Sequence, residues 1–235
     1  MSSLDGRVVA IAGAAGGLGP TVCCRLADAG ATIAATDVDQ ARLDALGSEL
    51  GLPGERWDGR AVDLLSAEGA ASWAASISER FGKVDALVHL VGGWKGGEPL
   101  ATAPLDDYEW LHDLLVRTLQ HATRAFHDAI AHEGGRFVLI SSSQAQRPDG
   151  TNASYGAAKA AAEAWTLALA DSLSESGATA NIIVVNAILT PAMRNENPDK
   201  AYKLFTSVED IAEAVAFLLS EGAQKMNGAR VELHP

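Results

Sequence analysis

The chain has 235 residues and a net charge of −12, and 48% of its residues are hydrophobic. The negative charge argues against nucleic acid as a partner, because phosphates require a basic face. No apolar run approaches the roughly 20 residues needed to span a bilayer, so we expect no membrane partner. Residues 1–7 lack the basic and apolar segments of an export signal, which favours a cytoplasmic protein.

Short β-rich apolar runs alternate with longer helical segments, a pattern typical of a parallel sheet covered by helices on both faces. The expected strands are residues 8–12, 32–36, 60–62, 86–91, 136–141, 181–188 and 229–233. The expected helices are residues 19–29, 40–50, 67–81, 104–132, 152–176 and 208–220, with a mobile loop or short helix at 195–206. No linker or repeat divides residues 1–235, so we expect one α/β domain with a doubly wound, Rossmann-like sheet of about seven parallel strands.

A glycine-rich turn follows the first expected strand and opens the first helix. Gly13, Gly17 and Gly19 let the backbone turn tightly and let a pyrophosphate approach the helix N-terminus, where free N–H groups favour anions. Gly16 and Leu18 complete this candidate cofactor site. A purely structural turn is the alternative, but the position between strand and helix is the one that a dinucleotide motif requires.

Asp37 ends the second expected strand, 18 residues after Gly19, and Val38 follows it; both are candidate cofactor contacts. A carboxylate here can bind the adenosine ribose hydroxyls and would repel a 2′-phosphate. The neighbouring positions Ala15, Gly16 and Val38 offer no cation to hold such a phosphate, so NAD is favoured over NADP. The alternative for Asp37 is a helix N-cap.

Further candidates follow the carboxyl ends of other strands, where open α/β sheets bind ligands. Asp63 and Leu64 end the third strand and are placed to meet the adenine, although a plain strand-end turn explains them equally well. Trp94, Gln144 and Met193 are candidate substrate contacts, with surface packing as the alternative for Trp94 and Met193. The two cysteines are adjacent and the six histidines are scattered, so we expect no metal site.

Tyr155 and Lys159 lie four residues apart in an alanine-rich helix and therefore share one helix face. A free tyrosine has a pKa near ~10, and a neighbouring ammonium favours the phenolate and lowers that pKa. The pair is then suited to proton transfer near neutral pH. Taken alone, the spacing is more typical of a solvated lysine beside a half-buried tyrosine, and only the other motifs reverse that interpretation.

Together these motifs resemble the short-chain dehydrogenase/reductase family, over nearly the whole chain. The resemblance implies that Ser142, 13 residues before Tyr155, holds the substrate carbonyl or hydroxyl. It also implies that Tyr155 is the general acid/base and that Lys159 binds the nicotinamide ribose. The further cofactor positions that it implies are Val91, Gly92, Ile188 and Thr190.

Three departures from the family pattern concern the proton relay more than cofactor binding. His89-Leu90-Val91-Gly92 replaces the family's Asn-Asn-Ala-Gly and keeps only the glycine. Leu115 stands where the family carries a further active-site Asn, and Val185-Asn186 replaces Pro-Gly.

The sequence therefore predicts an NAD-dependent oxidoreductase that acts on a small-molecule secondary alcohol or ketone. The alternative is a non-catalytic NAD-binding sensor or scaffold with a degenerate active site. The resemblance also implies a homo-oligomer, a dimer or more specifically a homotetramer, built through helices 104–132 and 152–176. A face of small residues supports that expectation: Ala157, Ala158, Ala161 and Ala162.

Overall fold

The computed structural model describes residues 3–233, so the first two residues of the N-terminal segment considered above lie outside it. Its central feature is a seven-stranded sheet in which every neighbouring pair is parallel. The strand order is β3-β2-β1-β4-β5-β6-β9, which confirms the predicted doubly wound topology. The strands are β1 (Val8–Ala12), β2 (Thr32–Asp37), β3 (Trp57–Ala61), β4 (Ala86–His89), β5 (Arg136–Ser142), β6 (Thr179–Val185) and β9 (Arg230–Glu232).

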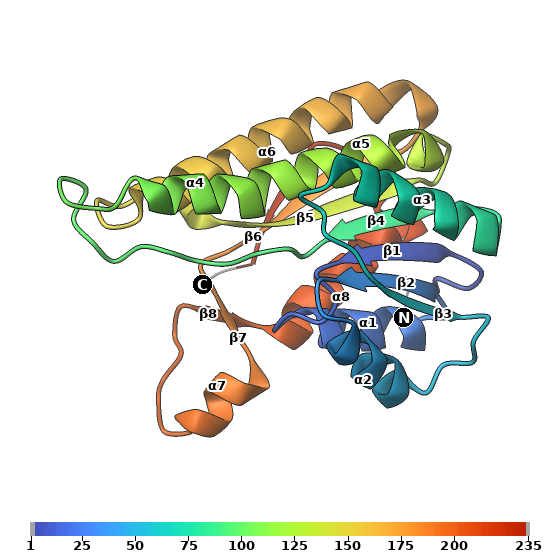
Figure 1. Ribbon diagram of the computed structural model, residues 1–235, viewed down its shortest axis with the longest axis horizontal. Coiled ribbons are helices and arrows are strands. Elements are labelled where there is room, and N and C mark those ends of the chain that lie inside the picture. The colour runs from blue at the N-terminus through green and yellow to red at the C-terminus, as the bar shows by residue number, and fades with distance from the viewer. Residues whose placement is uncertain (1–2, 234–235) are drawn as a thin grey trace.

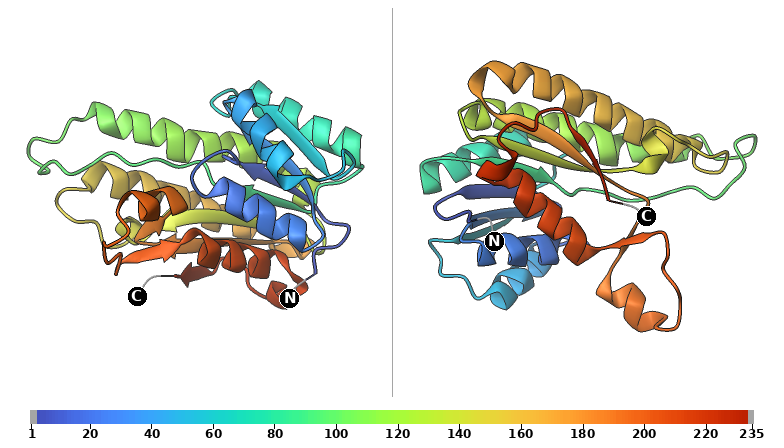
Figure 2. Two further views of the ribbon diagram at one scale, coloured as in Figure 1. Left: turned by 90° about the horizontal axis from the view of Figure 1, so that it is seen from below. Right: turned by 180° about the vertical axis from the view of Figure 1, so that it is seen from behind.

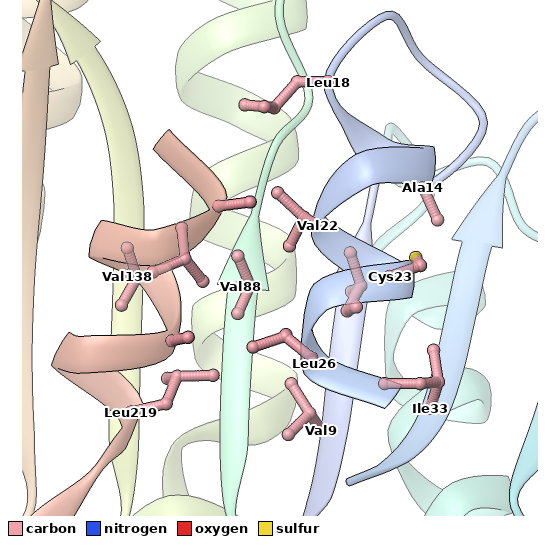
Figure 3. Packing of buried hydrophobic residues seen from close by; sticks show 14 of the residues in the cluster. Val9, Ala14, Leu18, Val22, Cys23, Leu26, Ile33, Val88, Val138 and Leu219 are labelled. Atoms are coloured by element: carbon pink, nitrogen blue, oxygen red, sulfur yellow. The ribbon is translucent and has the colours of Figure 1, made fainter. Parts of the chain in front are cut away.

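Helices cover both faces of the sheet (Figures 1 and 2). One layer contains α1 (Gly19–Asp28), α2 (Gln40–Leu50) and α8 (Val208–Leu219), and the other contains α3 (Ala67–Phe81), α5 (Thr118–Ile130) and α6 (Ala153–Leu173). Successive residues of a strand point to opposite faces of the sheet. Val9 therefore packs in the first core, beneath α1, α2 and α8, and Val8 packs in the second core, beneath α3, α5 and α6. Figure 3 shows Val22 and Leu26 of α1 packed in the first core, together with Leu219 of α8.

The helix predicted over residues 104–132 is found as one helical run, two residues shorter at each end, but it is not α-helical throughout. It consists of α4 (Asp106–His112), a π-helical turn (Asp113–Arg117) and then α5. A π-helical turn inserts an extra residue into the helix, which hydrophobic periodicity does not reveal, and such turns are frequent at functional sites.

The predicted strand 181–188 is broken at Asn186, between β6 and β7 (Ala187–Leu189). After β7 come α7 (Pro191–Glu196) and β8 (Phe205–Ser207), which pairs in parallel with β7. This small two-stranded unit was not predicted, and Figure 1 shows it projecting from the main sheet. Strand β3 begins at Trp57, three residues before the expected start, and β4 ends at His89, two residues before the expected end.

The small-residue face of α6 is only partly available to a partner chain. Ala158 and Ala162 are buried within the described chain, whereas Ala157 is exposed and Ala161 is half-buried. The prediction of one four-alanine docking face is therefore wrong, because the helix turns two of these residues toward its own core. Within residues 3–233, no helix is both long enough and apolar enough to cross a membrane.

Candidate active site

A cavity of about 900 Å³ runs along the carboxyl ends of the central strands. One end is formed by the glycine-rich turn after β1, and the other by Tyr155 and Lys159 of α6. The predicted site residues that line it are Gly13, Gly16, Gly17, Leu18, Asp37, Val38, Asp63, Leu64, Val91, Gly92, Trp94, Gln144, Tyr155, Lys159, Ile188, Thr190 and Met193. Such a cavity is large enough for a dinucleotide with a small substrate beside it.

The glycine-rich turn has no room for side chains. Gly13 has φ +79°, and a Cβ there would lie 2.8 Å from the Val91 backbone nitrogen. A Cβ on Gly17 would lie 3.2 Å from Cγ2 of Thr190, across the cavity wall. Gly19 does not line the cavity; a Cβ there would lie 2.1 Å from the Ala14 carbonyl oxygen, so its role is close packing. A bare backbone facing a helix N-terminus fits the phosphates of a nicotinamide cofactor.

Asp37 lies at the adenosine end of this cavity. Its Oδ2 accepts a hydrogen bond from the Ala15 N–H at 3.0 Å, and its Oδ1 accepts from the Val38 N–H at 2.8 Å. The N-cap interpretation is excluded because Asp39 caps α2, accepting from the Arg42 N–H at 3.2 Å. The carboxylate is thus held in place at the cavity wall by two backbone donors.

Arg42 is a cavity residue that the sequence argument missed. Its guanidinium donates to the Ala15 carbonyl, on the same side of the cavity as Asp37. The argument against a 2′-phosphate considered only positions next to the turn and to Asp37. The signal that would have found Arg42 is its place in the first turn of α2, five residues after Asp37.

Asp63 forms the local turn that was its alternative explanation, since its Oδ1 accepts from the Leu65 N–H at 2.8 Å. It still lines the cavity together with Leu64. At the other end, Thr190 caps α7 by accepting from the Met193 N–H at 3.3 Å.

Three side chains from two elements meet at the inner end of the cavity. Ser142 ends β5 and is buried, and its hydroxyl forms a hydrogen bond with Tyr155 of α6. Lys159 follows one turn later; its Nζ donates to the Ile140 carbonyl at 2.9 Å and lies 6.0 Å from the centre of the Tyr155 ring. The predicted Ser142, Tyr155 and Lys159 are therefore brought together, although Ser142 itself lies behind the cavity surface.

The pKa shifts of Tyr155 and Lys159 differ from those expected from the sequence. Burial raises the pKa of Tyr155 above its usual value, and the hydrogen bond with Ser142 works in the opposite direction. The predicted lowering of the Tyr155 pKa by Lys159 is therefore not found. Burial also lowers the pKa of Lys159 to about 8, against the opposing influence of Glu163. Desolvation is the largest cause of both shifts, because burial removes water from each charged form.

His89 occupies the position of the first family Asn, and it is buried beside this group. Burial, with the charge of Lys159 as a smaller cause, lowers the pKa of His89 to about 3. Its Nε2 lies 3.3 Å from the Thr118 hydroxyl, which donates to the Leu114 carbonyl at 2.6 Å. In the described part of the chain, His89 Nδ1 is buried without a hydrogen-bond partner.

Leu115 lies on the π-helical turn and is buried in an apolar cluster that Tyr155 also contacts. Its side chain fills space that a polar Asn would occupy only with a buried hydrogen-bond partner.

The substrate end of the cavity is mainly apolar, with a few amides. Trp94 donates from Nε1 to Oδ1 of Asn152 at 2.9 Å, which fixes its ring at the cavity edge. Gln144 donates from Nε2 to Oδ2 of Asp149 at 2.8 Å. Leu114 and Phe205, which the sequence did not suggest, also line the cavity. Phe205 belongs to β8, a strand that the sequence did not predict, so its place in the cavity could not be expected.

Comparison with known proteins decides the family. Residues 13–233 match the family model described as enoyl-(acyl carrier protein) reductase, one of the short-chain dehydrogenase/reductase models. The chain belongs to the short-chain dehydrogenase/reductase family.

A related family member is 7alpha-hydroxysteroid dehydrogenase of Escherichia coli, 28% identical over 96% of this chain and 91% of the relative. A short-chain dehydrogenase/reductase structure from Brucella melitensis, described as glucose/ribitol dehydrogenase, matches with a TM-score of 0.87 and 27% identity, over 99% of this chain and 96% of the other. A short-chain dehydrogenase from Burkholderia cenocepacia in complex with NADP matches with a TM-score of 0.85 and 28% identity, over 98% and 97%.

These relatives support dehydrogenase/reductase activity for this member of the short-chain dehydrogenase/reductase family, whose enzymes use nicotinamide cofactors. The glycine-rich cradle and the long cavity described above fit such a cofactor.

Proposed function

We propose that this protein is an NAD-dependent oxidoreductase that interconverts a secondary alcohol and a ketone, with Tyr155 as the general acid/base. The observation that carries the proposal is one continuous cavity that joins the Asp37 carboxylate to the Tyr155 hydroxyl and the Lys159 ammonium. This arrangement provides a cofactor cradle and a proton donor in the same cavity.

The cofactor, when bound, supplies hydride transfer, so the protein must orient the substrate and manage one proton. Negative charge develops on the substrate oxygen during reduction, and hydroxyl donors stabilise it. The Tyr155 hydroxyl is the donor that lines the cavity, and the Ser142 hydroxyl supports it from behind the cavity surface. Tyr155 gives its proton to that oxygen in reduction and accepts it in oxidation. Lys159 holds positive charge near the phenol and stabilises the resulting phenolate.

The preference for NAD over NADP rests on Asp37. Its carboxylate is pinned by two backbone N–H groups, so it cannot easily swing away from a 2′-phosphate. Arg42 has the opposite effect and favours NADP, because its guanidinium lies on the same wall of the cavity and attracts a 2′-phosphate. The Burkholderia cenocepacia relative is in complex with NADP, so the family fold accommodates a 2′-phosphate. We assign the preference to the carboxylate because the guanidinium is already engaged with the Ala15 carbonyl.

A second candidate is a non-catalytic NAD-binding sensor. The observations that favour it are Leu115 in place of a polar side chain and the raised pKa of Tyr155. The intact Ser142, Tyr155 and Lys159 group favours the enzyme, since a sensor has no use for an aligned proton donor.

The experiment that separates the two candidates is an absorbance screen for NADH formation across a panel of secondary alcohols, with calorimetry of NAD binding alongside. NAD binding with turnover of at least one alcohol supports the enzyme. Tight NAD binding without turnover of any alcohol, or of any ketone with NADH, supports the sensor.

We also propose a homo-oligomer built through α5 and α6, which run side by side on the outer face of the molecule (Figure 1). A groove between them is lined by Thr123, Arg124, His127, Asp128, Trp165, Ala168, Leu169 and Ser172. Light scattering at micromolar concentration tests this proposal, and a stable monomer contradicts it.

A further inference from the structure

Three consecutive residues of β5 each hold a different side chain of α6. The Ile140 carbonyl accepts from Lys159 at 2.9 Å, and the Ser142 hydroxyl bonds to Tyr155. Between them, the Ser141 hydroxyl donates to Oε1 of Glu163 at 2.6 Å. Glu163 therefore continues the row of Tyr155 and Lys159 along α6, because residues four apart share a helix face.

Glu163 is an acidic side chain in an interior position. It is only 4% exposed, and a buried carboxylate is costly unless charged or polar partners surround it. Arg230 of β9 supplies the charge: its Nε donates to Oε2 at 2.8 Å and its Nη2 to Oε1 at 3.4 Å. Gln146 adds a longer contact to Oε2 at 3.5 Å.

This ion pair does more than tie the last strand to α6, because Glu163 lies one helical turn from Lys159. The groups that face Lys159 from the surrounding elements are few. His89 of β4 is neutral at ordinary pH, and Tyr155 is uncharged until it loses its proton. Glu163 is then the one anionic side chain among these neighbours of the ammonium.

We propose that Glu163 is a positioning residue that keeps the buried Lys159 ammonium charged beside Tyr155, and that Arg230 limits this effect by sharing the carboxylate. The inference rests on the proposed roles of Tyr155 and Lys159. It assigns a function in the active site to the C-terminal strand, which contributes no residue to the cavity lining. Arg230 also faces Glu232 at 3.6 Å, so part of its charge is already balanced at the protein surface.

The two partners of the ion pair predict opposite effects on Lys159. Glu163→Gln keeps the shape and can still accept from Ser141, but it removes the negative charge. Lys159 should then lose its proton at lower pH, with its midpoint falling from about 8 by about one pH unit. Arg230→Gln removes the competing positive charge, so Lys159 should keep its proton to higher pH.

The test is a pH titration of Lys159 by NMR in protein labelled with ¹³C and ¹⁵N at lysine, without substrate or cofactor. The Lys159 signal is assigned by its loss in Lys159→Arg. Opposite shifts in Glu163→Gln and Arg230→Gln support the inference. Unchanged midpoints, or shifts of the same sign, overturn it and leave a purely structural ion pair that alters only thermal stability.

A third variant guards against misfolding of either single variant. Ser141→Ala weakens the hold on Glu163 without removing a charge, and it should move the Lys159 midpoint less than Glu163→Gln does. Because the titration needs no turnover, its outcome is independent of the alcohol screen. The Lys159 midpoint can shift as expected while no alcohol reacts, which would refute the proposed function alone.

Discussion

Lys159 donates a 2.9 Å hydrogen bond to the backbone carbonyl of Ile140, two residues before Ser142 on β5. This bond anchors the ammonium to the strand that carries Ser142, so the three side chains keep one geometry. Lys159→Met retains the length of the side chain but removes both the charge and this donor. We expect turnover to fall at least about tenfold and NAD binding to weaken, because a positioned charge is lost at the ribose end. Calorimetry and steady-state rates measure both effects.

A matched control for that variant is Lys225→Met. Lys225 is exposed and does not line the cavity, so its substitution should leave rate and affinity unchanged. Equal losses of turnover and NAD affinity in the two variants would contradict the role proposed for Lys159.

Asp37 and Arg42 predict opposite changes in cofactor preference. The unmodified protein should bind NAD(H) at least about tenfold more tightly than NADP(H), a difference of about 1.4 kcal/mol. Asp37→Asn should narrow that ratio because it removes the charge that repels a 2′-phosphate. Arg42→Gln should widen it because it removes the nearby cation. Calorimetry with both cofactors on all three proteins measures the ratios, and equal affinities in the unmodified protein contradict the assignment.

The buried His89 predicts a dependence of stability on pH. Its folded pKa of about 3 lies below the unfolded value of about 6.5, so the unfolded state binds its proton first. The stability that depends on neutral His89 is present above about pH 6.5 and is lost as pH falls toward 3. The slope contributed by this residue approaches about 1.4 kcal/mol per pH unit. Denaturant unfolding of the protein and of His89→Asn, at pH 7 and pH 5, should give a smaller pH dependence in the variant.

Leu115 predicts the cost of restoring a polar residue on the π-helical turn. Leu115→Asn would place an amide in the apolar cluster beside Tyr155, where it loses packing and finds no partner. We expect a loss of about 2–4 kcal/mol in the free energy of unfolding. Leu115→Met, which conserves volume, should cost less than about 1.5 kcal/mol. Comparable stability of the Asn variant and the unmodified protein would show that the site accommodates an amide.

Much of the fold could be predicted because the strand and helix patterns are local. Val8–Ala12 is a short, fully buried β-rich run, and Ala67–Phe81 ends at Gly82 in the left-handed conformation. The π-helical turn and the β7–β8 pair could not be predicted. The first depends on how one helix packs on the others, and the second on pairing between segments that are separately too short to show a pattern. The extent of the single domain stays a prediction.

The positions of the site residues could be predicted from their spacing in the sequence. Their pKa values could not, because these depend on burial in the folded chain. Tyr155 and Lys159 share a helix face in any α-helix, so their proximity followed from sequence. The direction of the Tyr155 pKa did not, because it depends on desolvation by the surrounding fold. Glu163 of α6 gave no signal either, since its partner Arg230 lies 67 residues away on β9.

The most direct test of the central claim is the turnover of Tyr155→Phe on an alcohol that the unmodified protein oxidises. The substitution keeps the half-buried ring in its place and removes only the hydroxyl that transfers the proton. Turnover should fall by about 10²–10⁴ while NAD affinity stays unchanged, and the exposed Tyr108→Phe should retain full activity. Full activity in Tyr155→Phe would contradict the account.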